Sequence, residues 1–297
     1  MKESNNRRII PAAGTRGCPS KLLWGWLCFV CLVLHAWSAG AQCIPAATVF
    51  KDGERVDYDL YFKWGMLMPK AGLATLSVKE AVFENDPAWH YRLLFRTSGM
   101  MEKVYKMRDT IDCYFSDRSR LLFSSKRTNE GDYYMVDNLK FRYPSTGTAV
   151  HSHRYNRKTT KVDTVLRVEG CLFDMLGATM YLRSLDWEKM DYGAEFPFHV
   201  AIGRETVRVS FRYTGQQIVD RGAVKFRTRH FYIDIIDEVF TQSRAAAEVW
   251  IGDDRNHLPV KIRAKLKIGA AEVYFKEAFN LAYPLDCRVV VVERYDR

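Results

Sequence analysis

The chain has 297 residues, 47% of them hydrophobic and 27% charged, and its formal net charge is +10. This length allows a sizeable core, in one large domain or two smaller ones. The chain contains no P-loop, no dinucleotide-binding fingerprint and no Gly-x-Ser-x-Gly nucleophile elbow, so the signatures of common nucleotide-dependent enzymes and α/β-hydrolases are missing. No nucleic-acid-binding motif accompanies the basic charge. We therefore expect no nucleic-acid partner and no cofactor.

The first 41 residues predict a secretory signal peptide. A basic start between Lys2 and Lys21 precedes the apolar segment Leu22–Leu34, and the small residues Ala39-Gly40-Ala41 follow. The apolar segment has 13 residues, fewer than the roughly 20 that a membrane-spanning helix needs. We expect cleavage after Ala41 and a periplasmic or extracellular protein. Its net charge would be about +6, because the leader carries five basic residues and one acidic residue.

Two alternatives to cleavage stay open. The leader could be retained as an N-terminal anchor, because Trp37 extends the apolar stretch. Cys43 could be the modified cysteine of a lipoprotein, but the residue before it is Gln42 and not the small residue of lipoprotein signals.

Four of the seven cysteines lie beyond the predicted leader: Cys43, Cys113, Cys171 and Cys287. In an oxidising compartment they permit two disulfides, with three connectivities, and buried free thiols are the alternative. Cys43 and Cys287 lie near the two ends and could join them. The wide spacing of all four excludes a CxxC redox motif or a zinc ribbon.

Most of residues 42–297 alternates in polarity, as half-buried antiparallel strands do. Aromatic and β-branched residues interleave with Arg, Lys and Thr, and Gly, Asn-Asp or Pro interrupts the runs. This predicts a mainly β fold of antiparallel curved sheets or open barrel-like lobes. The predicted strands are residues 56–62, 73–78, 89–96, 112–116, 121–127, 133–143, 164–168, 205–213, 223–235, 245–250, 259–268 and 271–283.

One segment repeats with helical spacing instead. Apolar residues three and four apart between Leu172 and Met180 predict an amphipathic helix from Cys171 to about Arg183, with a further turn over Leu185–Met190. This central helix, at about 171–190, would join two lobes of a single domain, about 50–168 and 192–297. An outer-membrane barrel is disfavoured, because basic residues occupy many alternate strand positions and the chain ends without a terminal aromatic.

Three further segments contain distinctive motifs: Gly53–Gly72, Phe173–Arg183 and Val249–Gly269. The first is similar to a Gly-Glu opening with a later Ala-Gly, the second to an Asp-x-Leu-small-Ala-x-x-Tyr-x-Arg helix, and the third to a Val-Trp-x-x-Asp-Asp…Pro-Val hairpin. Together, in this order, they resemble an exported bacterial family named only as domain of unknown function 3108. The resemblance implies an extracytoplasmic, mostly β protein, and it implies no activity and no catalytic residues.

The most metal-like motif is His151-Ser152-His153. On a strand, alternate residues share a face, so both imidazoles could reach one ion. The nearby cations Arg154, Arg157 and Lys158 would repel a metal, and a loop with two exposed histidines is the preferred interpretation. We predict no metal site.

Two sets of carboxylate residues are candidates for a binding or catalytic role. Asp253 and Asp254 with His257 could bind calcium or form an acid/base pair, but a structural turn explains them better. Asp234, with 237–238, could supply paired carboxylates for glycoside hydrolysis, which requires a separation that the sequence does not show. We predict no catalytic residues, and ligand-binding residues stay unknown.

The aromatic content, 13% of the chain, gives the better functional clue. Aromatic-rich antiparallel sheets can enclose an apolar cavity, although an ordinary core is the alternative. The leading hypothesis is a non-enzymatic envelope protein that binds a lipid or another apolar or amphipathic ligand. The second is a structural or interaction protein that contacts an envelope protein or an anionic surface through basic sheet faces. An uncharacterised hydrolase is the third.

Overall fold

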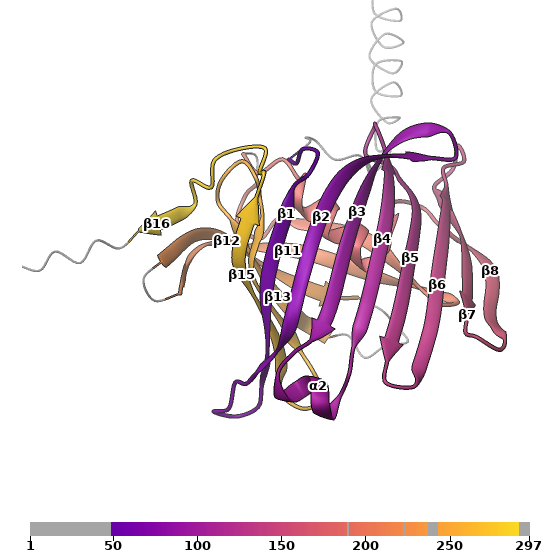
Figure 1. Cartoon of the computed structure of the whole chain (residues 1–297). Helices are drawn as coiled ribbons and strands as arrows, with labels where there is room; N and C mark the ends of the chain where they lie inside the picture. The colour runs from indigo at the N-terminus through magenta and orange to yellow at the C-terminus, as the bar shows by residue number, and fades with distance from the viewer. Residues whose placement is uncertain (1–48, 189, 222–223, 237–242, 291–297) are drawn as a thin grey trace, which may run out of the picture. The chain divides into compact units, whose positions relative to one another are not determined.

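The structure is a computed structural model, and it describes residues 49–188, 190–221, 224–236 and 243–290. These residues form one sheet of 16 strands, with two short helices (Figure 1). The helices are α2 (Met100–Val104) and α3 (Met175–Arg183). The strands are β1 (Arg55–Lys63), β2 (Lys70–Phe83), β3 (Asp86–Thr97), β4 (Arg108–Ser116), β5 (Leu121–Glu130), β6 (Tyr133–Arg142), β7 (Thr148–Tyr155), β8 (Thr160–Val168), β9 (Leu172–Phe173), β10 (Glu195–Ile202), β11 (Glu205–Asp220), β12 (Val224–Ile235), β13 (Ser243–Gly252), β14 (Pro259–Lys265), β15 (Ala270–Phe279) and β16 (Arg288–Val290).

Two antiparallel meanders make up the sheet. The first meander is β1–β8 and the second is β10–β15, and each strand pairs with its neighbours in sequence. The meanders join because β1 pairs with β15, from Arg55 opposite Phe279 to Lys63 opposite Ala270. The sheet passes from one meander to the other without a break.

The two ends of the sheet approach each other, so the sheet is nearly closed and barrel-like. The turn between β10 and β11 lies against β7 and β8. There the hydroxyl of Ser152 donates to the carbonyl of Gly203 at 2.5 Å, and the guanidinium of Arg204 donates to the carbonyl of Lys161 at 3.2 Å. Side chains thus connect the edges where no backbone ladder does.

Alternation along the strands separates an apolar interior from a polar outer face. On β2, Ala74, Leu76 and Val78 are buried, while Thr75 and Ser77 between them point to the other face. Because strand side chains alternate, this pattern fixes the register of the strand. The mainly antiparallel β prediction is confirmed.

The central helix packs into the interior. Asp174 caps α3 by accepting the backbone N–H of Gly177 at 2.7 Å, and it also accepts the hydroxyl of Ser124 on β5 at 2.7 Å. A Cβ at Gly177 would lie 2.8 Å from Asp174 Oδ1 and 2.9 Å from the Leu121 side chain, so a larger residue would have to displace them, and glycine allows this close approach of helix and sheet. The predicted helix start at Cys171 was too early, because Leu172 and Phe173 pair with β10 instead.

Several elements differ from the sequence prediction. The segment of His151 and His153 was expected as a loop, but it lies in β7. Strand β10 and helix α2 were not predicted, because Pro197 interrupts the first pattern and the second has only five residues. The turn expected over 185–190 is not helical in its described part.

The cysteines do not form the two disulfides that an even count permits. Cys171 is disulfide-bonded, whereas Cys113 and Cys287 carry free, buried thiols. A bond between Cys43 and Cys287 is therefore absent, and Cys43 itself, like the predicted leader, lies outside the described residues. The Cys113 thiol instead faces the Asp174 carboxylate at 3.3 Å, and Cys287 lies tightly against Gly252.

An ion cluster ties three strands of the first meander together on the outer face. Asp112 on β4 accepts from His90 and Arg92 on β3, each at 2.6 Å, and pairs with Arg127 on β5. Burial alone would raise the pKa of Asp112, but these donors outweigh it and lower the pKa to about 2.

We predict that Asp112→Asn lowers the free energy of unfolding by about 2 kcal/mol at pH 7. The folded pKa lies below the ordinary value of 3.8, so the contribution is present above about pH 4 and lost as the pH falls towards 2. Urea unfolding between pH 2 and 7 measures it. The exposed Asp163→Asn is the control and should leave stability unchanged. An equal loss for Asp112→Asn at both pH limits would contradict this account.

Candidate functional site

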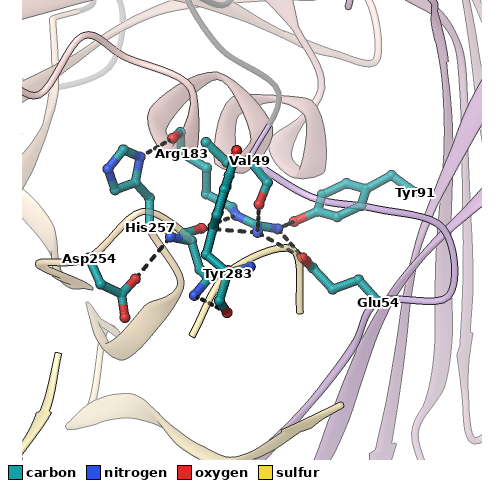
Figure 2. A network of polar contacts seen from close by, with 8 residues as sticks. Val49, Glu54, Tyr91, Arg183, Asp254, His257 and Tyr283 are labelled. Carbon is teal, nitrogen blue, oxygen red and sulfur yellow. Dashed lines mark hydrogen bonds and ion pairs between the residues drawn. The ribbon is translucent and has the colours of Figure 1, made fainter. Parts of the chain in front are cut away.

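A fully buried arginine at the end of α3 joins distant parts of the chain (Figure 2). The guanidinium of Arg183 donates to both carboxylate oxygens of Glu54, at 2.8 and 3.3 Å. It also donates to the Tyr91 hydroxyl at 3.3 Å, and to the carbonyls of Val49 and Asn256 at 3.2 and 3.1 Å. The side chains of the ion pair are 0% and 1% exposed. Such a pair is stable without water only when further hydrogen bonds satisfy it, as these do.

The turn between β13 and β14 holds the opposite side of the arginine. The side chain of Asn256 donates to the carbonyls of Tyr283 and Pro284, at 3.0 and 2.9 Å, and accepts the N–H of Tyr283 at 3.0 Å. Asp254 accepts the N–H groups of Asn256 and Cys287, at 2.9 and 3.2 Å. The turn therefore connects the helix to the C-terminal segment as well as to β1.

His257 completes the contact at the carboxyl end of the helix. Its Nδ1–H donates to the carbonyl of Arg183 at 2.6 Å, which satisfies an acceptor that a helix end leaves open. The imidazole stacks on Trp187, with ring centroids 4.1 Å apart and planes 9° from parallel. Burial lowers the pKa of His257, so the ring stays neutral in this position.

The pKa shifts of the residues in this cluster indicate a structural role. Burial opposes the charge on Arg183, but Glu54 more than offsets it and raises the pKa of the guanidinium. Burial also raises the pKa of Tyr91 to about 12. Neither group exchanges protons near neutral pH, and neither reaches solvent. We call Glu54, Tyr91, Arg183, Asn256 and His257 the Arg183 frame.

An apolar cavity of about 360 Å³ lies between α3 and the inner face of the second meander. Met175, Ala178 and Leu182 line it from the helix, and side chains of β10–β14 form the remaining walls. Apart from Thr179 and Lys265, every lining residue is apolar. Because Leu182 precedes Arg183 directly, the Arg183 frame sets the position of one cavity wall.

A second, smaller cavity of about 90 Å³ adjoins the first. The two share Met175 and Ile202 as lining residues. Its walls are mainly apolar, but they include the charged side chains of Lys126, Asp137, Arg154 and Asp174, of which Arg154 and Asp137 form an ion pair. Charged side chains therefore lie close to the larger apolar cavity inside the sheet.

Comparison with family models identifies the family to which the chain belongs. A family model described as "Protein of unknown function (DUF3108)" matches residues 57–276. The chain belongs to the DUF3108 family. The family resemblance predicted from the three segments is thus confirmed, and the description of the family assigns no activity.

A solved structure shares the fold of this DUF3108 chain. It is a β-barrel-like protein of domain of unknown function DUF1849 from Brucella abortus, with a TM-score of 0.55 and 10% sequence identity. The match covers 78% of this chain and 99% of that chain. At this identity the likeness shows the fold alone. No curated protein matches.

The Arg183 frame joins residues from all three of the segments that carry the family resemblance. Glu54 comes from the first segment, Arg183 ends the second, and Asn256 and His257 lie in the turn of the third. The sequence motifs contain both charged partners, Glu54 and Arg183, but their spacing in the sequence gives no reason to pair them. The one sequence feature that pointed to a buried ion pair is the single arginine at the end of an apolar helix.

The other candidate carboxylates of this DUF3108 protein form hydrogen bonds and ion pairs with neighbouring strands. Asp253 accepts from Gln216 and Arg229, at 2.9 and 2.8 Å, which suits the predicted structural turn. Asp234 accepts from Arg212 at 2.8 Å, and its predicted partners 237–238 lie outside the described residues.

The histidine motif does share a face, as predicted for a strand. The rings of His151 and His153 stack at 6.4 Å, and Asp163 from β8 lies 2.6 Å from His151. No group of three potential ligands that could hold a metal occurs among the described residues.

We predict strong coupling within the buried ion pair. Glu54→Gln or Arg183→Met alone should cost about 3–5 kcal/mol of unfolding free energy, because each leaves the other polar group buried without its partner. The double variant should cost clearly less than the sum of the two. Urea unfolding of the four proteins gives the coupling energy.

The exposed pair Lys276–Glu277, at 2.7 Å, is the matched control. Its coupling should be close to zero, because solvent screens it. Additive costs for Glu54 and Arg183 would show that the pair does not hold the helix.

Proposed function

We propose that this protein is exported and holds the apolar part of an amphipathic ligand in the cavity between α3 and the second meander, without catalysing a reaction. The observation that carries the proposal is the cavity itself. Its volume of about 360 Å³ falls within the usual range for small-molecule sites, roughly 300–1,000 Å³, and such sites are mostly apolar.

The walls favour an apolar chain over a polar substrate. Phe198, Phe211 and Val249 line the cavity from three different strands. A polar group placed among them would lose its hydrogen bonds to water without replacement. A hydrocarbon chain gains from the same burial, at about 0.8 kcal/mol per CH₂ group.

Charged groups near the cavity favour a ligand with a polar head. Lys265 is the one charged lining residue, and it is exposed at the end of β14. The neighbouring small cavity adds Lys126 and Arg154, together with the carboxylates of Asp137, which pairs with Arg154, and Asp174, which caps α3. Lys126 and Lys265 have no ion-pair partner among the described residues, and they suit an anionic head beside an apolar chain.

The Arg183 frame supports a preformed cavity. Hydrogen bonds on several sides of Arg183 fix α3 before a ligand arrives. A preformed site saves the cost of ordering side chains on binding.

The proposal that the protein is exported rests on the sequence of residues 1–41, which lie outside the described residues. No helix in the described part of the chain is long and apolar enough to cross a membrane. An intact mass that begins at Gln42, for protein from its own host, would support cleavage of the predicted leader.

An interaction role through basic sheet faces is the weaker candidate. Arg127 on β5, Arg154 on β7 and Arg263 on β14 each pair with a carboxylate of a neighbouring strand. Such pairing reduces the positive potential that an anionic partner would meet.

Native mass spectrometry of residues 42–297, purified from the protein's own host and followed by organic extraction, tests the proposed function. We expect one bound amphiphile per chain. Ala247→Phe, on the cavity wall of β13, should remove it by filling the space. Val165→Phe, exposed on β8, adds the same ring elsewhere and should keep the ligand. Absence of any ligand from the unsubstituted protein, together with no uptake of added fatty acid, would contradict the proposal.

A further inference from the structure

Three loops lie next to each other at one end of the sheet. They connect β1 to β2 (residues 64–69), β3 to β4 (98–107, with α2) and β14 to β15 (266–269). The order β4-β3-β2-β1-β15-β14 makes these strands neighbours. The start of β15 at Ala270 pairs with the end of β1 at Lys63, so all three loops are at the same end, which is the lower one in Figure 1.

Large apolar side chains project from all three loops into solvent. Met66 is fully exposed, and Trp64 and Ile268 are 60% and 67% exposed. Met100 and Val104 of α2 are 82% and 80% exposed. Exposed apolar side chains that gather on neighbouring loops mark contact surfaces for protein or membrane.

The same loops and their flanks are strongly basic. Residues 63–70, 98–108 and 265–269 contain seven lysines and arginines and one acidic residue, Glu102. Arg108 pairs with that glutamate, and Lys70 pairs with Asp59 of β1 at 2.6 Å. Lys103, Lys106 and Lys267 have no ion-pair partner among the described residues. An apolar tip surrounded by lysines matches the interface of an anionic bilayer, which offers hydrocarbon below and negative headgroups above.

One lining residue of the apolar cavity lies at this end of the sheet. Lys265 lines the cavity and directly precedes the loop 266–269. A bilayer that touches these loops would therefore lie beside the cavity.

We propose that these three loops dock the protein onto an anionic lipid bilayer, with Trp64, Met66 and Ile268 inserted among the headgroups. A second copy of the chain is a poorer occupant, because like charges would face each other across the contact. The docking does not depend on the proposed ligand and can fail or hold independently of it.

Co-sedimentation with vesicles tests the docking. It uses residues 42–297, which form one compact unit and contain every described strand and helix. We expect binding to vesicles of phosphatidylglycerol and phosphatidylethanolamine, at least tenfold weaker binding to phosphatidylcholine vesicles, and loss of binding at high salt. The combined variant Met66→Glu/Ile268→Glu should reduce binding to the anionic vesicles at least tenfold.

Val82→Glu is the matched control. Val82 is 70% exposed near the β2–β3 turn, at the opposite end of the strands, so this variant should bind as the unsubstituted protein does. Circular dichroism confirms that all variants fold. Equal binding by the loop variant and the control, or no binding to anionic vesicles at all, would overturn the docking proposal. Concentration-dependent dimers that the loop variant abolishes, without vesicle binding, would assign the surface to a second copy.

Discussion

The buried ion pair between Arg183 and Glu54 is the constraint on which the rest of the structure depends. A charged guanidinium with no access to water is tolerated only where acceptors surround it, and here they come from the segment before β1 and from the turn after β13. The pair therefore holds the helix, both meanders and the C-terminal segment in one arrangement. Removing either partner leaves a charge that the interior cannot solvate.

The two sides of the fixed helix α3 face different parts of the sheet. One side of α3 is used for packing against β4 and β5, where Asp174 and Gly177 permit close contact. The other side leaves an apolar space in front of the second meander. The small cavity adjoins this space at Met175 and Ile202, and Lys265, which lines the space, precedes the basic and apolar loop 266–269. The proposed binding of an apolar chain and the proposed docking to a bilayer would therefore use adjacent parts of the fold.

Sequence patterns predicted this fold well where alternation was regular, as in β2 and β3, because the period of two reports burial directly. They failed at β7, where His151, Ser152 and His153 are polar, and at β9, where two apolar residues matched helical spacing but pair with β10. The Arg183 frame could not be derived, because its members are up to 203 positions apart, from Glu54 to His257. The aromatic content suggested that the sheet could enclose an apolar cavity, but the residue spacing did not identify the residues that line it.

A crystal structure of residues 42–297, purified from the native host without added lipid, tests the central claim most directly. The account predicts elongated density along Phe211 and Val249, with its polar end towards Lys265 and the α3 position unchanged from that set by Arg183. A cavity closed by its own side chains, or one that holds only ordered water, would contradict the claim that this fold is a carrier of an apolar chain.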